Sequence, residues 1–362
     1  MNKIKALIIL PAYSVGGAEK VMFSYFNNFK HSKIDLSLLI SNSKRKKKIS
    51  DSKNLMEFNY RKFIFMIPKL VSLVKKNNFR VIISTFPNVS VYLIILRCLK
   101  IINSKIIIRQ PNVIGQSLNQ SIKLRFIKFI YILIIKYADA VIVTSRYMQQ
   151  EAIKNRISKN KIFFLKNPID PKNIRKGLSP IRFLDETIKL IFVGRLVYQK
   201  GIDRVLGIIK SIKQIKLIII GEGKEKNRLL EMVKKLKIEK RVTFLGFKKN
   251  PFKYVSGADY FLLPSRWEGL PNCVLESLAL GTPVLAFNQI YALNDFEENI
   301  KNKSIILSKN EYDLEKILKE LKKRKDYKKP KLRKNLLNKY LSPNEYKKKI
   351  NAIILKLNEK KN

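Results

Sequence analysis

Short apolar runs alternate with longer amphipathic segments along almost the whole chain, in two successive series. The first series predicts buried β-strands at 6–10, 36–40, 81–84, 105–108, 140–143 and 161–165. The second series predicts strands at 190–193, 217–220, 242–245, 260–263, 284–286 and 304–307. Helical patterns lie between the strands, at 17–30, 68–77, 121–137, 201–213, 224–236 and 271–280. This alternation predicts parallel sheets covered by helices on both faces, and two series predict two such domains.

The boundary between the domains is expected in the stretch 168–187, which contains Pro171, Gly177 and Pro180. The sequence therefore predicts an α/β, doubly wound architecture in three parts. They are an N-terminal Rossmann-like domain at 1–170, a C-terminal Rossmann-like domain at 171–342 and a terminal helix at 343–362. A length of 362 residues is enough for two domains that each bury a core of their own.

Composition excludes several classes of protein. The chain has 75 Lys+Arg against 27 Asp+Glu, but its 46% hydrophobic content is too high for a disordered polybasic chain. Two cysteines, Cys98 and Cys273, cannot form a disulfide framework, which favours a reducing compartment. A single histidine, His31, excludes a histidine-based metal site and any Ser/His or Cys/His dyad that does not use it.

The positive charge is spread over the chain rather than confined to a tail. Residues 1–170 carry 31 Lys+Arg and 7 Asp+Glu, and the remainder carries 44 and 20, so each part has a surplus of 24. Nucleic acid and anionic lipid are both candidate partners for such a chain. A lysine-rich codon bias explains part of the surplus, but not the scarcity of acidic residues in the first half. The N-terminal stretch 1–14 does not have the pattern of a signal peptide, and no apolar stretch is long enough to span a bilayer. We therefore expect a cytoplasmic protein, free or bound to the membrane surface.

Three clusters of candidate ligand-binding residues follow predicted strands, where parallel sheets bind their ligands. Gly16 and Gly17 open the first helix, at a place where backbone amides favour an anion. Gly194-Arg195 and Lys200-Gly201 flank a loop whose two cations suit a diphosphate. The third cluster is Gly221-Glu222-Gly223. Each has a structural alternative, an ordinary turn or solvated cations. None is a G-x-G-x-x-G or Walker motif, so the standard dinucleotide and P-loop interpretations fail.

The fourth cluster is the most informative. It reads PSRWEGLPNCVLESLALGTPV from residue 264, with Pro271 predicted in the first turn of a helix and Gly281 at its end. Glu268 precedes the helix, and Glu276 lies on it eight positions later. The amides of Gly269 and Leu270 are predicted at the helix N-terminus, where they would hold a phosphate. Two carboxylates beside a phosphate site suit the recognition of sugar or ribose hydroxyls.

At these motifs the sequence resembles the family 4 glycosyltransferases, retaining nucleotide-sugar enzymes of the GT-B fold. The resemblance rests on Glu268-x7-Glu276 together with FVGRLVYQKGIDRVL, IIIGEGKEKNRLL, VTFLGF, GADYFLLPS, ADAVIVTS, NPID and the N-terminal GGAEKV. It extends to about residue 286. It implies two Rossmann-like domains that face a central cleft, and transfer of a sugar, most simply from a UDP-sugar, without a metal or other cofactor.

The resemblance also implies roles for particular residues. Glu268 would contact the donor sugar, and Arg195 and Lys200 would hold the diphosphate and stabilise the leaving group. The remaining donor-binding residues would be Gly16, Gly17, Gly194, Gly221, Phe247, Gly269, Leu270 and Glu276. Phe247 belongs to the segment 244–247, which would line the base pocket largely through its backbone. Glu276 would hold the ribose hydroxyls.

One departure from the family concerns the first domain. Many members carry a functional histidine after a central strand, but the corresponding stretch here is Arg109-Gln110-Pro111-Asn112. Arg109, Gln110 and Asn112 are therefore the candidate first-domain site, with Gln110 or Asn112 in place of the histidine. His31 is expected to be exposed and unrelated. A second departure is FNQIYALNDFEE after Pro283, where sugar selection would differ.

The acceptor is predicted from the segment 121–137, SIKLRFIKFIYILIIKY, which is apolar, aromatic and basic without an acidic residue. It suits an anionic membrane surface, with the basic loop 44–48 adding to it, although a buried helix is an equal alternative. The resemblance favours the membrane and implies a lipid-linked or polysaccharide acceptor in bacterial O-antigen, capsule, exopolysaccharide or lipopolysaccharide synthesis. Two other functions stay open: a nucleic-acid-binding protein, and a sugar-nucleotide epimerase or phosphorylase of the same fold. We find no nucleic-acid recognition motif, so we expect no nucleic-acid partner.

Overall fold

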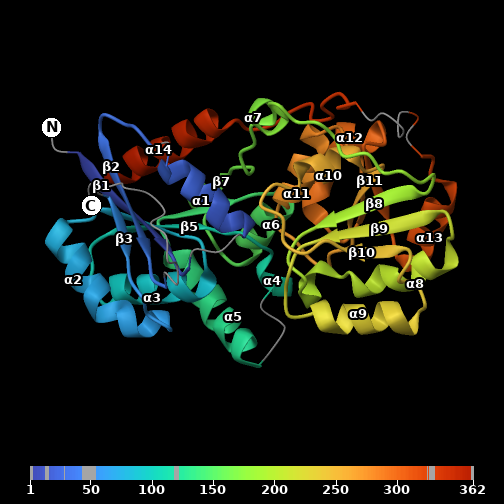
Figure 1. Cartoon of the computed structure of the whole chain (residues 1–362). Helices are drawn as coiled ribbons and strands as arrows, with labels where there is room; N and C mark the ends of the chain where they lie inside the picture. The colour runs from blue at the N-terminus through green and yellow to red at the C-terminus, as the bar shows by residue number, and fades with distance from the viewer. Residues whose placement is uncertain are drawn as a thin grey trace. The chain divides into compact units, whose positions relative to one another are not determined.

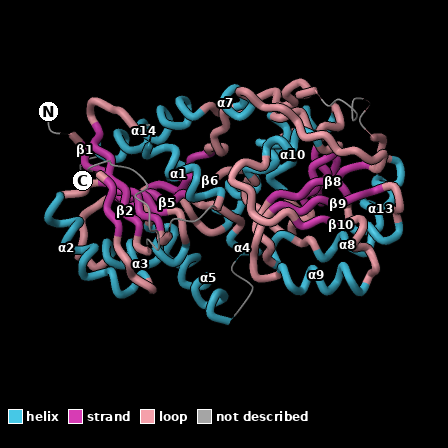
Figure 2. The backbone as a smooth tube through the Cα atoms, in the orientation of Figure 1, coloured by secondary structure: helices cyan, strands magenta, loops and turns pink. Residues whose placement is uncertain are grey.

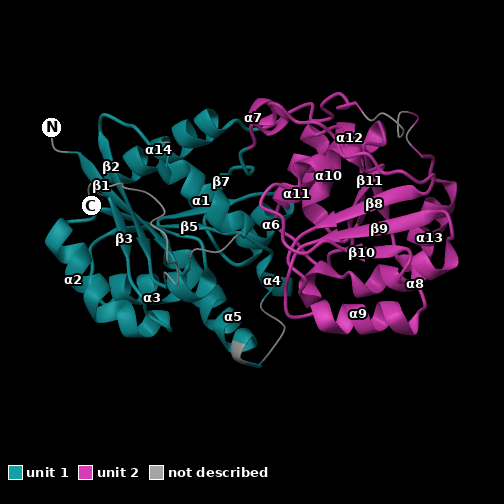
Figure 3. Cartoon of the chain, in the orientation of Figure 1, with its two compact units in different colours: residues 1–168, 341–362 teal, residues 169–340 magenta. Residues whose placement is uncertain are grey.

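The computed structural model describes residues 3–12, 16–27, 29–42, 54–117, 122–323, 325 and 331–359. The chain forms two compact units (Figure 3). Unit 1 comprises residues 1–168 together with 341–362, and unit 2 comprises residues 169–340. The basic loop 44–48, which the sequence assigns to the membrane-facing surface, lies outside the described residues.

Unit 1 is built on a seven-stranded sheet in which every pair of neighbouring strands is parallel. In spatial order its strands are β3 (Leu55–Glu57), β2 (Ile34–Ile40), β1 (Ile4–Leu10), β4 (Val81–Ser84), β5 (Lys105–Arg109), β6 (Ala140–Val143) and β7 (Ile162–Phe164). The central strands are buried on both faces, which explains why their sequences are mostly apolar rather than alternating.

Helices cover both faces of this sheet (Figures 1 and 2). One face packs against α1 (Gly17–Asn27) and α14 (Pro343–Glu359), and the Tyr25 hydroxyl of α1 donates to Asn351 Oδ1 of α14 at 2.7 Å. The other face packs against the 3₁₀ turn η1 (Phe63–Met66), α2 (Ile67–Asn77), α3 (Pro87–Cys98), α5 (Ile122–Ile134) and α6 (Arg146–Lys154). The short helix α4 (Ile114–Ser117) follows β5. The C-terminal helix is therefore part of unit 1.

Unit 2 is built on a six-stranded parallel sheet. Its order is β10 (Val242–Phe244), β9 (Ile215–Ile220), β8 (Ile188–Val193), β11 (Tyr260–Leu263), β12 (Val284–Phe287) and β13 (Ile305–Ser308). One face packs against α7 (Pro171–Arg175), α10 (Phe252–Gly257), α11 (Asn272–Ala279) and α12 (Glu297–Lys301). The other packs against α8 (Asp203–Ser211), α9 (Lys226–Lys235) and α13 (Glu311–Glu320).

The predicted α/β class and the two parallel sheets are confirmed, and the differences are local. The strand β3 and the helices α3 and α6 are absent from the sequence prediction. Six of the twelve residues of α3 are buried, so this helix shows little of the polar–apolar alternation by which a helix is recognised. The predicted linker 168–187 is not free chain either, because Arg175 in α7 donates to the backbone carbonyls of Ala279 and Arg333 within unit 2, both at 2.7 Å.

The topology indicates where each sheet would bind a ligand. The strand order reverses between β1 and β4 in unit 1 and between β8 and β11 in unit 2. In open parallel sheets the crevice beyond the carboxyl ends of these central strands is the usual binding site. Within the described residues, none of the helices has the length and apolar character that crossing a membrane requires.

Candidate active site

The loops after β8 and β11 bring together the two charged residues on which the sequence prediction depends most. Lys200 lies at the end of the loop after β8, and Glu268 lies in the loop after β11. Lys200 Nζ is 2.5 Å from Glu268 Oε1, and the two side chains are 14% and 8% exposed. Because β8 and β11 are neighbours at the reversal of strand order, the pair lies beyond the strand ends where the topology predicts a ligand.

The Glu268 carboxylate has further donors around it. The Ser265 hydroxyl donates to Oε1 at 2.8 Å, and the Gln199 side-chain amide approaches Oε2 at 3.5 Å. Burial lowers the pKa of the Lys200 ammonium, but the carboxylate beside it outweighs this effect, and the net pKa of Lys200 is raised. Lys200 therefore stays cationic at neutral pH, as a group that binds phosphate must.

Helix α11 starts directly after this pair. The sequence predicts a helix over 271–280 with Pro271 in its first turn. In the structure Pro271 is instead the N-cap, in an extended conformation, and the helix runs from Asn272 to Ala279. Gly269 and Leu270, at its N-terminal end, are buried. Glu276 is half-buried on the same helix. Burial raises the pKa of the Cys273 thiol to about 12; the nearby Lys200 ammonium opposes this rise, and the carboxylates of Glu268 and Glu276 add to it. Cys273 is thus a neutral thiol among the charged groups of the site.

The predicted glycines of unit 2 allow backbone segments to pack closely at the strand ends. Gly221 has φ +149°, and a Cβ there would collide with the carbonyl oxygen of Gly194. The two loops after β8 and β9 therefore touch through these glycines. Arg195 and Phe247 have exposed side chains, and that of Phe247 is 55% exposed. Both are accessible to a ligand at this edge of the sheet.

In unit 1, Gly16 and Gly17 lie at the start of α1, as expected, and Gly16 accepts the backbone hydrogen bond of Lys20 at 3.0 Å. The rest of their motif, residues 14 and 15, lies outside the described residues. His31 is half-buried rather than exposed, because its ring lies 6.4 Å from that of Phe29. It precedes β2 and so lies at the amino ends of the strands, away from the crevice.

Arg109, at the end of β5, is fully buried. Its Nε donates to the Tyr346 hydroxyl at 3.1 Å, and one terminal nitrogen donates to Asn167 Oδ1 at 2.6 Å. The other terminal nitrogen has no hydrogen-bond partner among the described residues. Tyr346 belongs to α14, so Arg109 connects the sheet of unit 1 to the C-terminal helix.

Gln110 and Asn112 lie in a polar cluster around Glu151. The Gln110 amide nitrogen donates to the Asn112 carbonyl at 3.1 Å and to Glu151 Oε2 at 3.3 Å. The backbone amides of Ile114 and Gly115 donate to the same carboxylate at 3.0 and 2.8 Å. The buried Gln110 Oε1 has no partner within the described part of the chain. Burial raises the pKa of Glu151, against the effect of these donors.

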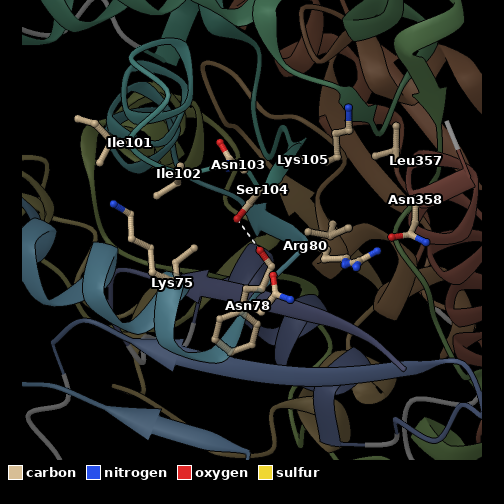
Figure 4. Close-up of a pocket in the computed structure, with 13 residues that line it drawn as sticks. Lys75, Asn78, Arg80, Ile101, Ile102, Asn103, Ser104, Lys105, Leu357 and Asn358 are labelled. Carbon is tan, nitrogen blue, oxygen red and sulfur yellow. Dashed lines mark hydrogen bonds between the residues drawn. The ribbon is translucent and has the colours of Figure 1, made fainter. Parts of the chain in front are cut away.

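A separate depression of about 580 Å³ lies at the amino ends of β4 and β5 in unit 1 (Figure 4). Lys75, Arg80 and Lys105 line it, but in the figure their charged ends point in different directions. It contains none of the predicted site residues. Across the described ranges, no three or more His, Cys, Asp or Glu side chains gather as metal ligands would.

Sequence reasoning missed several residues that complete the site. They are Gln199, Asp203, Ser265, Arg266, Cys273 and Gln289. Arg266 and Asp203 form an ion pair with Arg266 nitrogens at 2.9 and 2.8 Å from the two carboxylate oxygens, and Gln289 reaches the Ser265 carbonyl at 3.3 Å. Ser265, Arg266 and Cys273 stand inside the sequence motif around Glu268, and this position was the signal that could have identified them. Polar residues are so common in the chain that spacing alone does not show which of them contact each other.

Two family models match consecutive parts of the chain. Residues 15–173 match the model described as Glycosyltransferase Family 4, and residues 175–339 match the model described as Glycosyl transferases group 1. The chain belongs to glycosyltransferase family 4. The first match covers the sheet of unit 1 except β1, the second covers the sheet of unit 2, and the family expected from the motifs is thereby confirmed.

The relatives of this family 4 chain include two curated proteins that are similar over part of their length. An uncharacterized glycosyltransferase of Methanocaldococcus jannaschii is 32% identical over 199 residues, which are 51% of this chain and 48% of that protein. The N-acetylgalactosamine-N,N'-diacetylbacillosaminyl-diphospho-undecaprenol 4-alpha-N-acetylgalactosaminyltransferase of Campylobacter jejuni is 35% identical over 161 residues, 44% of each chain. The chain thus spans about half the length of these curated relatives.

Among solved structures, the Anabaena protein HepE in complex with UDP and glucose has a TM-score of 0.73. The likeness covers 98% of this chain and all of that chain at 16% identity. This likeness confirms the GT-B fold.

Proposed function

We propose that the chain is a retaining glycosyltransferase that moves a sugar from a nucleotide-sugar, most simply a UDP-sugar, to a lipid-linked or polysaccharide acceptor. The observation that carries this proposal is the Lys200–Glu268 pair, buried at the carboxyl ends of β8 and β11. Membership of family 4 supports it, as does the UDP and glucose bound to the structural neighbour.

The cations of the site suit the diphosphate of the donor, and its carboxylates suit the hydroxyls of the sugar and the ribose. Lys200, kept cationic by Glu268, and the exposed Arg195 would hold the diphosphate and stabilise the charge that develops as the leaving group departs. Gly269 and Leu270 would offer backbone amides at the N-terminus of α11. Glu268 would accept hydrogen bonds from sugar hydroxyls, and Glu276, further along α11, from the ribose.

Transfer would break the bond between the anomeric carbon and the diphosphate oxygen and form a bond to an acceptor hydroxyl oxygen. The hydroxyl proton would leave toward the departing diphosphate. The positive charges of Lys200 and Arg195 supply the stabilisation that a divalent cation provides elsewhere, so we propose that neither a metal nor another cofactor is needed. Retention would appear as an α-linked product from an α-linked donor, read by proton NMR of the anomeric signal.

The acceptor side of the proposal is a polyprenyl-linked or other cell-surface glycan at the inner face of a bacterial cytoplasmic membrane. The Campylobacter jejuni relative acts, by its name, on a diphospho-undecaprenol-linked sugar. In the chain itself, α5 carries a stripe of exposed apolar side chains: Ile122 (86% exposed), Phe126 (64%), Phe129 (60%) and Leu133 (51%). Their spacing of four, three and four residues puts them on one face of the helix.

Two further exposed apolar side chains lie on other elements of unit 1. Phe65 of η1 and Leu99 at the end of α3 are 65% and 64% exposed, and both elements pack in the same helical layer of unit 1 as α5. Residues 58–138, which contain all three elements, include 14 Lys+Arg and no Asp or Glu. Apolar side chains among cations without anions suit an anionic lipid surface, and we propose that unit 1 docks there.

The proposal is tested by thermal-shift binding of UDP-, GDP- and ADP-glucose in the presence of EDTA, with duplex DNA as the control. We expect one nucleotide-sugar to raise the melting temperature of the wild type and not that of Glu276→Ala. Stabilisation by DNA alone would contradict the proposal and favour the nucleic-acid alternative. If the protein converts the nucleotide-sugar to an epimer, or catalyses phosphorolysis, without transferring sugar to an acceptor, the epimerase or phosphorylase alternative is favoured.

A further inference from the structure

Arg266 joins the two loops that carry Lys200 and Glu268. It lies in the loop after β11, two residues before Glu268. Its backbone amide donates to the Gln199 carbonyl at 2.7 Å, and a guanidinium nitrogen donates to the Tyr198 carbonyl at 2.8 Å. Both acceptors belong to the loop after β8, immediately before Lys200. Arg266 thus fixes the backbone that presents Lys200.

Asp203 holds the Arg266 guanidinium from the first turn of α8. Its two oxygens accept from the two terminal nitrogens of Arg266 at 2.9 and 2.8 Å, the two-point geometry that only arginine offers. Burial would raise the pKa of Asp203, but its bonds to Arg266 and to Arg228 lower it below the usual value. Asp203 is therefore ionised at neutral pH, and the Arg266–Asp203 pair persists there.

Further contacts tie the same two loops together around this pair. The Arg266 guanidinium lies 3.9 Å from the centre of the Tyr198 ring, and the Gln199 side chain donates to the Trp267 carbonyl at 2.9 Å. Gly201 takes φ +65°, and a Cβ there would collide with the Pro264 carbonyl of the other loop. The loops meet through backbone on both sides of the Lys200–Glu268 contact, so their relative position is fixed.

We propose that Arg266, locked by Asp203, is a positioning residue that sets the geometry of Lys200 against Glu268. No hydrogen bond or ion pair described for Arg266 reaches the Lys200 or Glu268 side chain, so it acts through the loop Tyr198–Lys200. The inference rests on the proposed function in so far as Lys200 and Glu268 act on the donor. Misplacing catalytic groups by about 1 Å costs up to about 100-fold in rate.

The sole tryptophan of the chain makes the pair measurable without any substrate. Trp267 follows Arg266, is 7% exposed and lies 6.2 Å from the Tyr198 ring. If Arg266 holds the loops together, its loss admits water to the indole. We expect Arg266→Met and Asp203→Asn to shift the emission of Trp267 to longer wavelength and to raise its quenching by acrylamide.

A matched control exists on the same helix. Arg204, next to Asp203, donates to Glu311 at 2.6 Å. No hydrogen bond described for Glu311 reaches residues 198–200 or 264–268, and Glu311 acts on Arg266 only through its charge. We expect Glu311→Gln to keep the Trp267 emission and a kcat within twofold of wild type. Arg266→Met and Asp203→Asn lower kcat by about 10- to 100-fold, with an unchanged KM for the acceptor, and Asp203→Glu restores most of the loss.

Two results would overturn the proposal. Unchanged Trp267 emission in both Arg266→Met and Asp203→Asn would mean that the Arg266–Asp203 pair does not order the loops. This test needs no substrate, so its result is valid even if no donor is found. Red-shifted emission and stronger quenching of Trp267 together with a wild-type kcat would mean that the Arg266–Asp203 pair is a purely structural contact. If wild-type protein transfers no sugar while Trp267 responds as expected, the proposed function fails and the ordering of the loops does not. Asp203→Asn, which keeps the side-chain shape, supplies the answer where Arg266→Met does not fold.

Discussion

The strand ends of the two units use polar residues in opposite ways. In unit 2, the loops after β8 and β11 direct Lys200 and Glu268 toward each other at the crevice, with Ser265 and Arg266 around them. In unit 1, the Arg109 side chain at the end of β5 points into the interior, where it donates hydrogen bonds to Tyr346 and Asn167. Charged residues that follow parallel strands thus pair with each other across two loops in one unit, and in the other a charged residue at a strand end attaches a helix.

The outer surfaces differ as well. The helical layer of unit 1 that contains α3 and α5 exposes large apolar side chains in an acid-free stretch. The outer helices of unit 2 carry ion pairs instead, such as Lys226–Glu222 and Lys319–Glu315, both at 2.9 Å. The two units thus differ in what they offer a ligand: unit 2 holds a buried pair of opposite charges at its strand ends, and unit 1 exposes apolar side chains among cations. This difference is the basis of our proposal that the donor binds in unit 2 and that unit 1 docks on the membrane.

The largest effect is expected from Glu268→Gln. The substitution keeps the size of the side chain but removes the charge that raises the pKa of Lys200 and that would meet the donor sugar. We expect sugar transfer to fall by about 100- to 1,000-fold, measured as kcat with radiolabelled donor. The control is Glu315→Gln, which breaks the ion pair with Lys319 on α13 of the same unit, outside every candidate cluster. Equal activity of the two variants would place the chemistry elsewhere.

The next effect concerns the apolar stripe of unit 1. Replacing Phe126 and Phe129 together by serine removes two exposed aromatic rings from α5. Burying one such ring contributes about 1.5–3 kcal/mol, so we expect partitioning onto vesicles of anionic lipid to weaken about 100-fold or more. Co-sedimentation measures it, and Tyr312→Ser, at a 68% exposed position of unit 2, should bind like wild type. Undiminished binding of the double variant would remove α5 from the docking surface.

A smaller effect is expected from breaking the hydrogen bond between Arg109 and Tyr346. Tyr346→Phe removes the hydroxyl that accepts from Arg109 Nε and leaves that buried donor without its partner. The free energy of unfolding should fall by about 1–3 kcal/mol, whereas the affinity for a nucleotide-sugar should not change. Chemical denaturation and calorimetric titration measure the two quantities, with the 42% exposed Tyr340→Phe as control. A lost affinity would instead make Arg109 part of the donor site.

The smallest effect is a dependence on pH at Glu151. Burial raises its pKa above the usual 4.5 in the folded protein, so the folded state binds a proton more tightly than the unfolded state. Its contribution to stability is full below the ordinary pKa and is lost as the pH rises through the raised one. In denaturation at several pH values, wild type should therefore lose stability relative to Glu151→Gln as the pH rises from about 4.5. A constant difference would contradict the raised pKa.

The fold was predictable because its signals are local. Buried strands such as β1 and β4 are largely apolar runs, and a proline follows each of them closely, Pro11 after β1 and Pro87 at the start of α3. The helix α3 was missed because half of its residues are buried and exposed positions such as Ile95 are apolar too, which leaves little polar–apolar alternation.

The candidate site was predictable only in part. Lys200 and Glu268 stand in loops after strands, so the parallel topology alone brings them near each other. The Arg266–Asp203 pair depends on the conformation of both loops, and spacing does not encode it. The partner of Arg109 lies 237 residues away in α14, so only the packing of that helix decides that the guanidinium is buried.

The most direct test of the assignment of donor binding to unit 2 is backbone amide exchange of the full chain with and without UDP, in EDTA. We expect slower exchange at 194–201 and at 269–273, and unchanged exchange at 101–105 beside the depression of unit 1. Protection confined to that depression, or none at saturating UDP, would contradict the assignment of donor binding to the loops after β8 and β11.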